Sequence, residues 1–348
     1  MRRVSLNHIT PGMRLAKSIY HGSSLILREG TPDLQRYVSG LNNLGIFSIY
    51  IDDSISVDID IPDAISEITR VKCKNVLQGA FDSIKRQGNL KSSIFSDAIN
   101  ILLEELFSRD NILISLQDIG TTDDATLIHS INTTVLCLLI GKQLNLSKVE
   151  LYKLAEGSLL HDIGKTLLKP SILLKTTPLT KEEFEHIKEH PLLGYELLKK
   201  NPFMTELSRI IALQHHERLD GSGYPYGLKS DKLHLFSKIT AIADMYDALT
   251  AERCYRTSMS NYQAYKILME SSKSKIDSTL LGLLLQNVAI YPNGVVVNLS
   301  NGTRGIVKSQ NTSMPFRPVI RIIDDINHET VQLYDADLMK DLDITIVE

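Results

Sequence analysis

The sequence predicts a mainly α-helical protein with a small α+β domain at its N-terminus and a small β-rich, SH3-like module at its C-terminus. Three observations lead to this prediction. The chain has 348 residues, more than a single core usually supports, so two or three domains are expected. Between about 120 and 285, apolar residues recur with helical spacing. After Tyr291 the pattern changes to short strands separated by turns.

The N-terminal α+β domain is expected over residues 1–60. It contains short runs of β type and a predicted helix at about 32–44. The β-type runs are at 14–20, 24–27 and 46–51. Residues 61–119 then show one apolar helical face, interrupted at Gln87-Gly88-Asn89. We expect this segment to be a helical connector, with a homodimer formed through it as one option.

The central domain is expected over residues 120–287 and the β-rich module over 288–348. Helices are predicted at 122–144, 149–165, 206–214 and 236–252. Another helix begins at Thr180, because Thr180-Lys-Glu-Glu183 has the pattern of a capping box. Strands are predicted at 295–297, 305–307, 319–323 and 330–334.

Composition restricts the partners and the compartment. With 38 Lys and Arg against 41 Asp and Glu, the chain has no general basic surface for DNA or RNA. Only three cysteines occur, without a CxxC motif, which suits a reducing compartment. The N-terminus has no apolar stretch typical of a signal peptide, and the longest apolar run, Val135–Ile140, is far shorter than the ~20 residues that span a bilayer. We expect a soluble, cytoplasmic protein.

Two pairs of adjacent residues indicate metal chemistry. His161-Asp162 ends the helix predicted at 149–165, where neighbouring side chains diverge by about 100°. Asp162 suits a bridge between two ions because a carboxylate has two oxygens. A helix-end pair is the plainer interpretation. His215-His216 ends the helix at 206–214, before a glycine-rich loop, and is hard to explain by packing.

Single histidines and aspartates extend this set. His129 lies on a core-facing helix, where a lone histidine is more often structural than a ligand. His190 precedes Pro191, which kinks its helix or starts a new one; His186 competes with it, but lies among glutamates on a solvated face. Asp244 and Asp247 lie three apart on a largely apolar helix, so one of them is expected to bind metal.

Together these motifs resemble the HD-GYP family, the branch of HD-domain phosphohydrolases that cleaves cyclic dinucleotides. The resemblance covers about 125–285. It rests on these motifs: His129-Ser130, His161-Asp162-Ile-Gly-Lys165, His190-Pro191 with Gly194, His215-His-Glu217, Asp220-Gly-Ser-Gly-Tyr-Pro225, and Asp244-Met-Tyr-Asp-Ala-Leu-Thr250 with Arg253 and Tyr255-Arg256.

The resemblance implies an all-helical HD-type metal-dependent phosphohydrolase domain and gives roles to individual residues. The implied metal ligands are His129, His161, Asp162, His190, His215, His216 and Asp244. Asp162 is the implied bridge, and Lys165 assists catalysis. Lys165, Tyr224, Arg253 and Arg256 are the implied substrate-binding residues. Asp247, Asp220 and Glu217 are expected to support the site structurally.

Two departures from the family pattern matter. Four residues before His129, where members with a third metal have a glutamate, this chain has Ala125. We therefore expect two metal ions. Cys254 replaces the proline common between Arg253 and Tyr255, which removes no charge.

The physical chemistry of the predicted site agrees with the implied reaction. Two ions roughly 3.5–4 Å apart activate a bridging water for in-line attack on a phosphodiester. A nitrogen and oxygen ligand set without thiolate favours iron, manganese, cobalt or nickel over structural zinc, and we expect iron or manganese. Gly221 and Gly223 allow a turn that brings Tyr224 to the ligand, and Tyr224-Pro225 is a candidate cis bond, although most X-Pro bonds are trans. Arg253 and Arg256 can each hold a phosphate with two hydrogen bonds, the alternative being a solvated helix end.

The predicted function is therefore hydrolysis of cyclic di-GMP to linear pGpG, with further cleavage to GMP left open. Cyclic GMP-AMP is an alternative substrate. A protein that responds to cyclic dinucleotides as a binding or scaffold protein is a different class, and the complete ligand set argues against it. Other HD-type hydrolases act on dNTPs or guanosine tetraphosphate, and the Gly-Tyr-Pro loop argues against that reaction.

Overall fold

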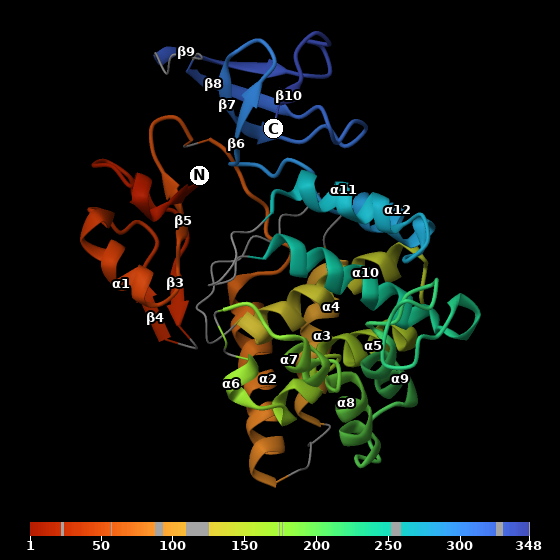
Figure 1. The fold of residues 1–348 in the computed structure, drawn as a ribbon. Coiled ribbons are helices and arrows are strands. Elements are labelled where there is room, and N and C mark those ends of the chain that lie inside the picture. The colour runs from red at the N-terminus through yellow and green to blue at the C-terminus, as the bar shows by residue number, and fades with distance from the viewer. Residues whose placement is uncertain are drawn as a thin grey trace. The chain divides into compact units, whose positions relative to one another are not determined.

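The structure, a computed structural model, describes residues 1–21, 24–56, 58–87, 93–108, 125–173, 175, 177–251, 259–324 and 330–347 (Figure 1). These residues form two compact units. The first unit combines the described residues of 1–63 and 288–348, and the second, helical unit combines those of 64–111 and 123–287. Most of the predicted connector at 61–119 is therefore grouped with the helical unit.

The N-terminal segment of the first unit is α+β, as predicted. Its elements are β1 (Arg2–Ser5), β2 (Arg14–Leu15), β3 (Ile19–His21), β4 (Ser24–Leu27), a 3-10 helix (Leu34–Tyr37), α1 (Val38–Asn43) and β5 (Ser48–Asp52). The prediction of one strand at 14–20 was wrong, because β2 pairs with β5 whereas β3 pairs with β4 in a separate sheet. Strand β1, which pairs with β5, was not predicted.

The C-terminal segment of the first unit is a five-stranded antiparallel sheet, which confirms the β-rich module. Its strands are β6 (Val296–Leu299), β7 (Arg304–Ser309), β8 (Val319–Asp324), β9 (Thr330–Asp337) and β10 (Ile346–Val347), in the order β10-β6-β7-β8-β9. In β8 every second side chain is buried, including Ile320 and Ile322. This alternation gives the sheet one apolar face.

Ion pairs connect the two segments of the first unit. The Arg321 guanidinium pairs with the carboxylates of Asp58 and Asp335, and the Lys308 ammonium pairs with the same two carboxylates. The Asn293 side-chain amide donates to the Asp60 carbonyl at 2.7 Å. Arg321 and Lys308 hold the pKa of Asp58 well below its usual range.

The second unit is helical. Its α-helices are α2 (Glu67–Gln87), α3 (Ser93–Phe107), α4 (Ala125–Gln143), α5 (Lys148–Leu159), α6 (Pro170–Leu173), α7 (Lys181–Ile187), α8 (His190–Lys199), α9 (Glu206–Gln214), α10 (Leu235–Thr250), α11 (Asn261–Ser271) and α12 (Ser278–Leu285). The predicted capping box at Thr180 is present at the start of α7. Of the predicted break at 87–89, Gln87 is the last residue of α2, and Gly88 and Asn89 lie outside the described residues.

Helix α4 is the core of this unit. It packs against α2, α3, α5, α10 and α12 (Figure 1). Among the described residues, α4 is the one helix whose length and apolar composition would suffice to cross a membrane, but 72% of that stretch is buried inside the fold. Such burial is typical of a core helix, which passes the same test by composition.

A close contact joins the 3-10 helix Ile163–Leu167 to α8. A Cβ atom on Gly164 would lie 2.0 Å from the His190 carbonyl oxygen and 2.6 Å from the Gly194 backbone nitrogen. Both atoms belong to the backbone and cannot move aside as a side chain can. Glycine at 164 thus permits the approach that brings His190 beside Asp162.

Replacing Arg321 by methionine should lower the free energy of unfolding of the first unit at pH 7, and this loss should shrink as the pH falls below about 4. The folded-state pKa of Asp58 lies below its unfolded value of about 3.9, so the stabilisation is present above that value and disappears as the pH falls through the folded-state pKa. Urea denaturation between pH 7 and pH 3 measures it. Arg36→Met, which changes an arginine with a side chain 78% exposed, is the control. A loss that is constant with pH would contradict the prediction.

Gly164→Ala should destabilise the helical unit by about 3 kcal/mol, the upper end of the usual cost of overpacking, because backbone atoms block the new methyl group. Gly282→Ala is the matched control. It lies within α12 with open space around its Cβ position, and should stabilise by about 0.5–1 kcal/mol. Urea denaturation of both variants gives the comparison. Equal stability of the two variants would show that the 3-10 helix shifts to admit the methyl group.

Candidate metal centre

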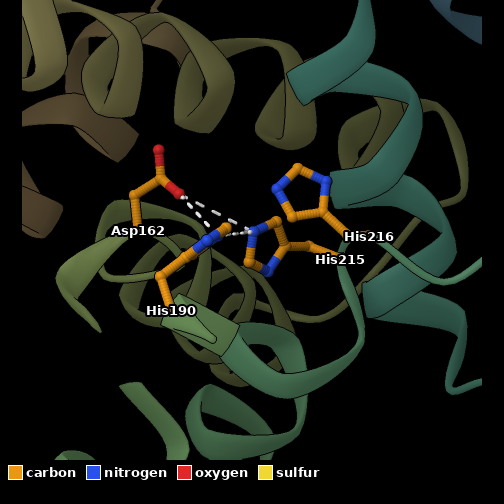
Figure 2. Close-up of side chains that lie close together, drawn as sticks. All are labelled: Asp162, His190, His215 and His216. Carbon is orange, nitrogen blue, oxygen red and sulfur yellow. Dashed lines mark hydrogen bonds and ion pairs between the residues drawn. The ribbon is translucent and has the colours of Figure 1, made fainter. Parts of the chain in front are cut away.

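The helical unit brings all seven predicted metal ligands into two adjacent buried groups. One group contains Asp162, His190, His215 and His216, and the other contains His129, His161 and Asp244. Within each group the potential ligand atoms lie within 4.8 Å of one another. Figure 2 shows the side chains of the first group pointing toward one another.

Helix ends orient three of the histidines. His161, His190 and His215 each place Nδ1 against a backbone carbonyl in the last turn of a helix, where carbonyls have no partner in the helix itself. The distances are 2.6 Å from His161 to Ser158, 2.7 Å from His190 to Ile187, and 2.9 Å from His215 to Ala212. A carbonyl only accepts, so Nδ1 carries the proton. A neutral ring with this tautomer leaves Nε2 free to bind a metal ion.

In the first group two of these Nε2 atoms face one another. The Nε2 atoms of His190 and His215 lie 3.2 Å apart, and both lie near Asp162 Oδ1, at 3.2 and 3.7 Å respectively (Figure 2). His216 completes the group, with Nδ1 3.7 Å from Asp244 Oδ2. Burial lowers the pKa of His215 to about 4 and lowers that of His216 as well. Both rings are therefore neutral at pH 7 and able to bind a metal ion.

The second group lies on the other side of Asp162. Asp244 Oδ1 is 3.0 Å from His129 Nε2 and 3.9 Å from His161 Nε2. Asp162 Oδ2 is 3.4 Å from His161 Nε2 and 3.7 Å from His129 Nε2. The two oxygens of Asp162 thus face different groups, Oδ1 the first and Oδ2 the second.

The residues present fit divalent cations. Asp162 Oδ1 and His161 Nε2 are buried without a hydrogen-bond partner in the described part of the chain. Unpaired buried acceptors are costly, and clustered electron pairs repel one another unless positive charge lies between them. The centre is therefore a buried His/Asp cluster able to bind metal, built from nitrogen and oxygen donors.

Lys165 contributes a fixed positive charge. Its Nζ lies 2.5 Å from Asp162 Oδ2. Burial alone would raise the pKa of Asp162, but the Lys165 ammonium holds it well below its usual range. Asp162 is therefore an ionised carboxylate in the centre of the cluster.

His129 is held between two aspartates. Its Nδ1 lies 2.6 Å from Asp247 Oδ2, on the side opposite Asp244. Burial lowers the pKa of His129, but hydrogen bonds to Asp244 and Asp247 outweigh this effect and raise it to about 9. In the protein without metal, a proton on Nε2 is thus shared with Asp244. Of the two aspartates on α10, Asp244 joins the ligand group and Asp247 supports His129.

The chain leaves the helix before His161, which corrects one prediction. Helix α5 ends at Leu159, not at 165, and His161 and Asp162 lie in the turn before the 3-10 helix. Inside a helix the two side chains would diverge by about 100°. In the turn both face the cluster. Pro191 was expected either to kink its helix or to start a new one. The second alternative is observed, because α8 begins at His190 and Pro191 lies in its first turn.

The glycine-rich loop brings Tyr224 to the metal centre. The Tyr224 ring stacks on His216, with ring centroids 4.7 Å apart and planes inclined by 28°. Buried Glu217 accepts hydrogen bonds from the backbone N–H groups of Tyr226 and Leu228, at 2.8 and 2.9 Å. The cis bond between Tyr224 and Pro225, raised as a candidate, is present. The two hydrogen bonds to Glu217 hold the loop that carries Tyr224.

Several predicted residues are outside the cluster or outside the described residues. His186, on α7, places Nδ1 3.1 Å from Glu189 Oε2 and belongs to neither ligand group among the described residues. Asp220 caps its own turn by accepting from Ser222. Arg253, Cys254 and Arg256 lie outside the described residues.

Two residues near the site were not predicted. Asn132 donates from Nδ2 to Asp247 Oδ1 at 3.0 Å. The sequence feature that could have indicated this role is a polar residue one turn after His129 on a core helix. Lys188 places Nζ 5.7 Å from the centroid of the Tyr224 ring, and nothing in its local sequence indicated that contact.

Comparison with known proteins agrees with this geometry. Residues 95–280, more than half of the chain, match the HD domain family, and residues 296–348 match a KOW domain associated with HD domain. A protein of Pseudomonas aeruginosa named cyclic di-GMP phosphodiesterase is 31% identical over 227 residues, which are 65% of this chain and 55% of that protein. The chain thus spans little more than half the length of this relative.

A second relative has a different named substrate. The 3'3'-cGAMP-specific phosphodiesterase 3 of Vibrio cholerae is 37% identical over 166 residues, which are 47% of this chain and 36% of that protein. A solved HDG"Y"P protein from Bdellovibrio bacteriovorus has a similar fold, with a TM-score of 0.50 and 16% identity, covering 81% of this chain and 97% of that one. Because the family match covers more than half of the chain and spans the helices that carry the metal centre, this protein belongs to the HD domain family.

Proposed function

We propose that this protein is a metal-dependent phosphodiesterase that hydrolyses cyclic di-GMP to linear pGpG. The observation that carries the proposal is the position of Asp162, whose two oxygens face two separate groups of nitrogen and oxygen donors. One carboxylate shared by two groups is the arrangement that a two-metal phosphodiesterase needs. The relative from Pseudomonas aeruginosa supports this choice of substrate.

We assign the ligands by group. His129, His161 and Asp244 hold one ion, His190, His215 and His216 hold the other, and Asp162 contributes to both. The absence of thiolate among these donors favours iron or manganese. When bound, the two ions supply acidification of a water molecule and neutralisation of the charge that develops on the phosphodiester.

The protein's own residues prepare this chemistry. Lys165 keeps Asp162 ionised and adds a positive charge 2.5 Å from its Oδ2. We propose that Tyr224, whose ring stacks on His216 beside the cluster, contacts a guanine base of the substrate. We propose that Arg253 and Arg256 hold the phosphates, since a guanidinium can donate two parallel hydrogen bonds to one phosphate.

Cyclic GMP-AMP is the second candidate substrate, favoured by the 37% identity to the Vibrio cholerae protein. Parallel assays with both cyclic dinucleotides separate the two. A binding protein without turnover is the third outcome of the same assays. We further propose that the protein acts in the cytoplasm without a nucleic-acid or membrane partner, and that a homodimer forms through the segment at 61–119.

The test of the proposed function is anaerobic turnover of cyclic di-GMP by protein loaded with Fe(II) or Mn(II), with nucleotides resolved by chromatography. Accumulation of pGpG supports the proposal, with GMP appearing later if cleavage continues. Intact cyclic di-GMP together with cleaved cyclic GMP-AMP would change the substrate. Intact samples of both would favour the binding protein.

Asp162→Ala should reduce turnover roughly 1,000-fold or more, the equivalent of about 4 kcal/mol of transition-state stabilisation, because both groups lose their shared oxygen ligand. Metal analysis of the variant should show fewer than two bound ions. Asp231→Ala, at an exposed aspartate in a short 3-10 helix, is the control and should leave turnover unchanged. Near-normal turnover in Asp162→Ala would exclude the two-metal arrangement.

Arg253→Ala should raise KM roughly 10- to 100-fold while lowering kcat much less, because a charged two-point contact to substrate phosphate contributes about 1.5–3 kcal/mol. Arg253→Lys keeps the charge without the paired donors, so its KM should fall between the two. Steady-state kinetics of the three proteins measure the effect. A fall in kcat with unchanged KM would instead mean that Arg253 acts in the transition state.

A further inference from the structure

A chain of buried hydrogen bonds leads from α2 to the metal centre. The Arg70 guanidinium donates from Nη1 to Asn132 Oδ1 at 3.1 Å. Asn132 donates from Nδ2 to Asp247 Oδ1 at 3.0 Å. Asp247 Oδ2 accepts from His129 Nδ1 at 2.6 Å. Arg70 lies in the first turn of α2, 59 residues before His129 in the chain.

The chemistry of the groups fixes the direction of this chain. Arginine only donates, so the side-chain oxygen of Asn132 must face Arg70. A carboxylate only accepts, so the NH₂ group of Asn132 must face Asp247. Arg70 and Asp247 therefore require the same orientation of the Asn132 side-chain amide. Asp247 in turn requires a proton on His129 Nδ1, which directs the electron pair of Nε2 to the ligand group.

All members of the chain are removed from water. Arg70 is 7% exposed, Asn132 2% and Asp247 1%. At such sites each donor and acceptor needs a partner, and loss of one partner leaves the next member free to turn. A change at Arg70 can therefore reach His129 through two side chains. Glu67, one turn earlier, pairs with Arg70 at 3.7 Å and is half-exposed.

We infer that Arg70 is a positioning residue for the ion held by His129, His161 and Asp244. It fixes the amide of Asn132, which holds Asp247 and through it the ring of His129. None of the motifs that define the metal centre includes Arg70. The inference rests on the ligand groups assigned under the proposed function, and it specifies that only one of the two ions depends on α2.

The test uses the full chain, stripped of metal by a chelator and titrated with Mn(II), with free Mn(II) read by electron paramagnetic resonance. Arg70→Met and Arg70→Lys have side chains of similar length, but only the lysine donates a hydrogen bond. Arg70→Met should weaken one class of Mn(II) site by about tenfold, the lower end of the range for residues that support metal ligands, and leave the other class unchanged. Arg70→Lys should restore most of that affinity. Lys72→Ala, at an exposed position on the same helix, should change neither class.

A double-mutant cycle tests whether the effect passes through Asp247. Asp247→Asn alone should weaken the same class of site, by roughly 10- to 100-fold. Adding Arg70→Met to Asp247→Asn should then cause little further loss, because the path is already broken. If Arg70→Met does not fold, Asn132→Ala interrupts the same chain within α4 and should give the same selective loss.

The outcomes separate this inference from the proposed function. Unchanged Mn(II) affinity in Arg70→Met and Asn132→Ala, or equal weakening of both classes, would overturn the inference and leave Arg70 a purely structural residue. Selective weakening without hydrolysis of either cyclic dinucleotide would support the inference while the proposed function fails. If both hold, excess Mn(II) should restore the turnover of Arg70→Met.

Discussion

An ionised carboxylate in a place without water is the constraint on which the helical unit depends. Asp162 is 1% exposed, and a charge so buried is stable only among donors and cations. Lys165 compensates part of this charge at Oδ2. In their neutral form, His161, His190 and His215 present an unprotonated Nε2, which adds electron density instead of removing it. The rest of the negative charge on Asp162 must be compensated by positive charge between the two ligand groups. This explains why so many metal-binding side chains surround one carboxylate.

The ends of helices provide most of the ligands. Five of the seven residues lie at or just beyond a helix terminus: His161, Asp162, His190, His215 and His216. Carbonyls in the last turn of a helix lack partners within the helix, and here they fix the protonation of imidazoles. The same feature thus satisfies the backbone and orients the ligands. His129 and Asp244 lie inside helices and have no such carbonyl, and Asp247 takes that role for His129.

Local sequence predicted the helices and the ligand types, but not how distant residues meet. The helix at 206–214 and the capping box at Thr180 follow from short-range pattern, and both are present. The turn at His161 was missed because apolar periodicity continues past Leu159, while tertiary contact through Gly164 ends the helix. The contact of Arg70 with Asn132 joins residues 62 apart, and no local pattern encodes it.

The same limit applies in the first unit, where strand β1 was missed. Its four residues have too little alternation to signal a strand, and β5, more than 40 residues later, provides its partner. Arg321 and Asp58 also form a contact that local sequence does not predict, because they are 263 residues apart in the chain. Residues of each charge sign are common on a surface, so only the folded chain selects which of them pair.

The ion pairs between Asp58, Arg321 and Lys308 also have a topological meaning. They join the first and last segments of the chain into one unit, with the helical unit inserted between them in the sequence. Removal of the C-terminal segment would leave Asp58 without either cation, and removal of the N-terminal segment would leave Arg321 and Lys308 to share Asp335 alone, so a truncation at either end would weaken the charge balance of the other.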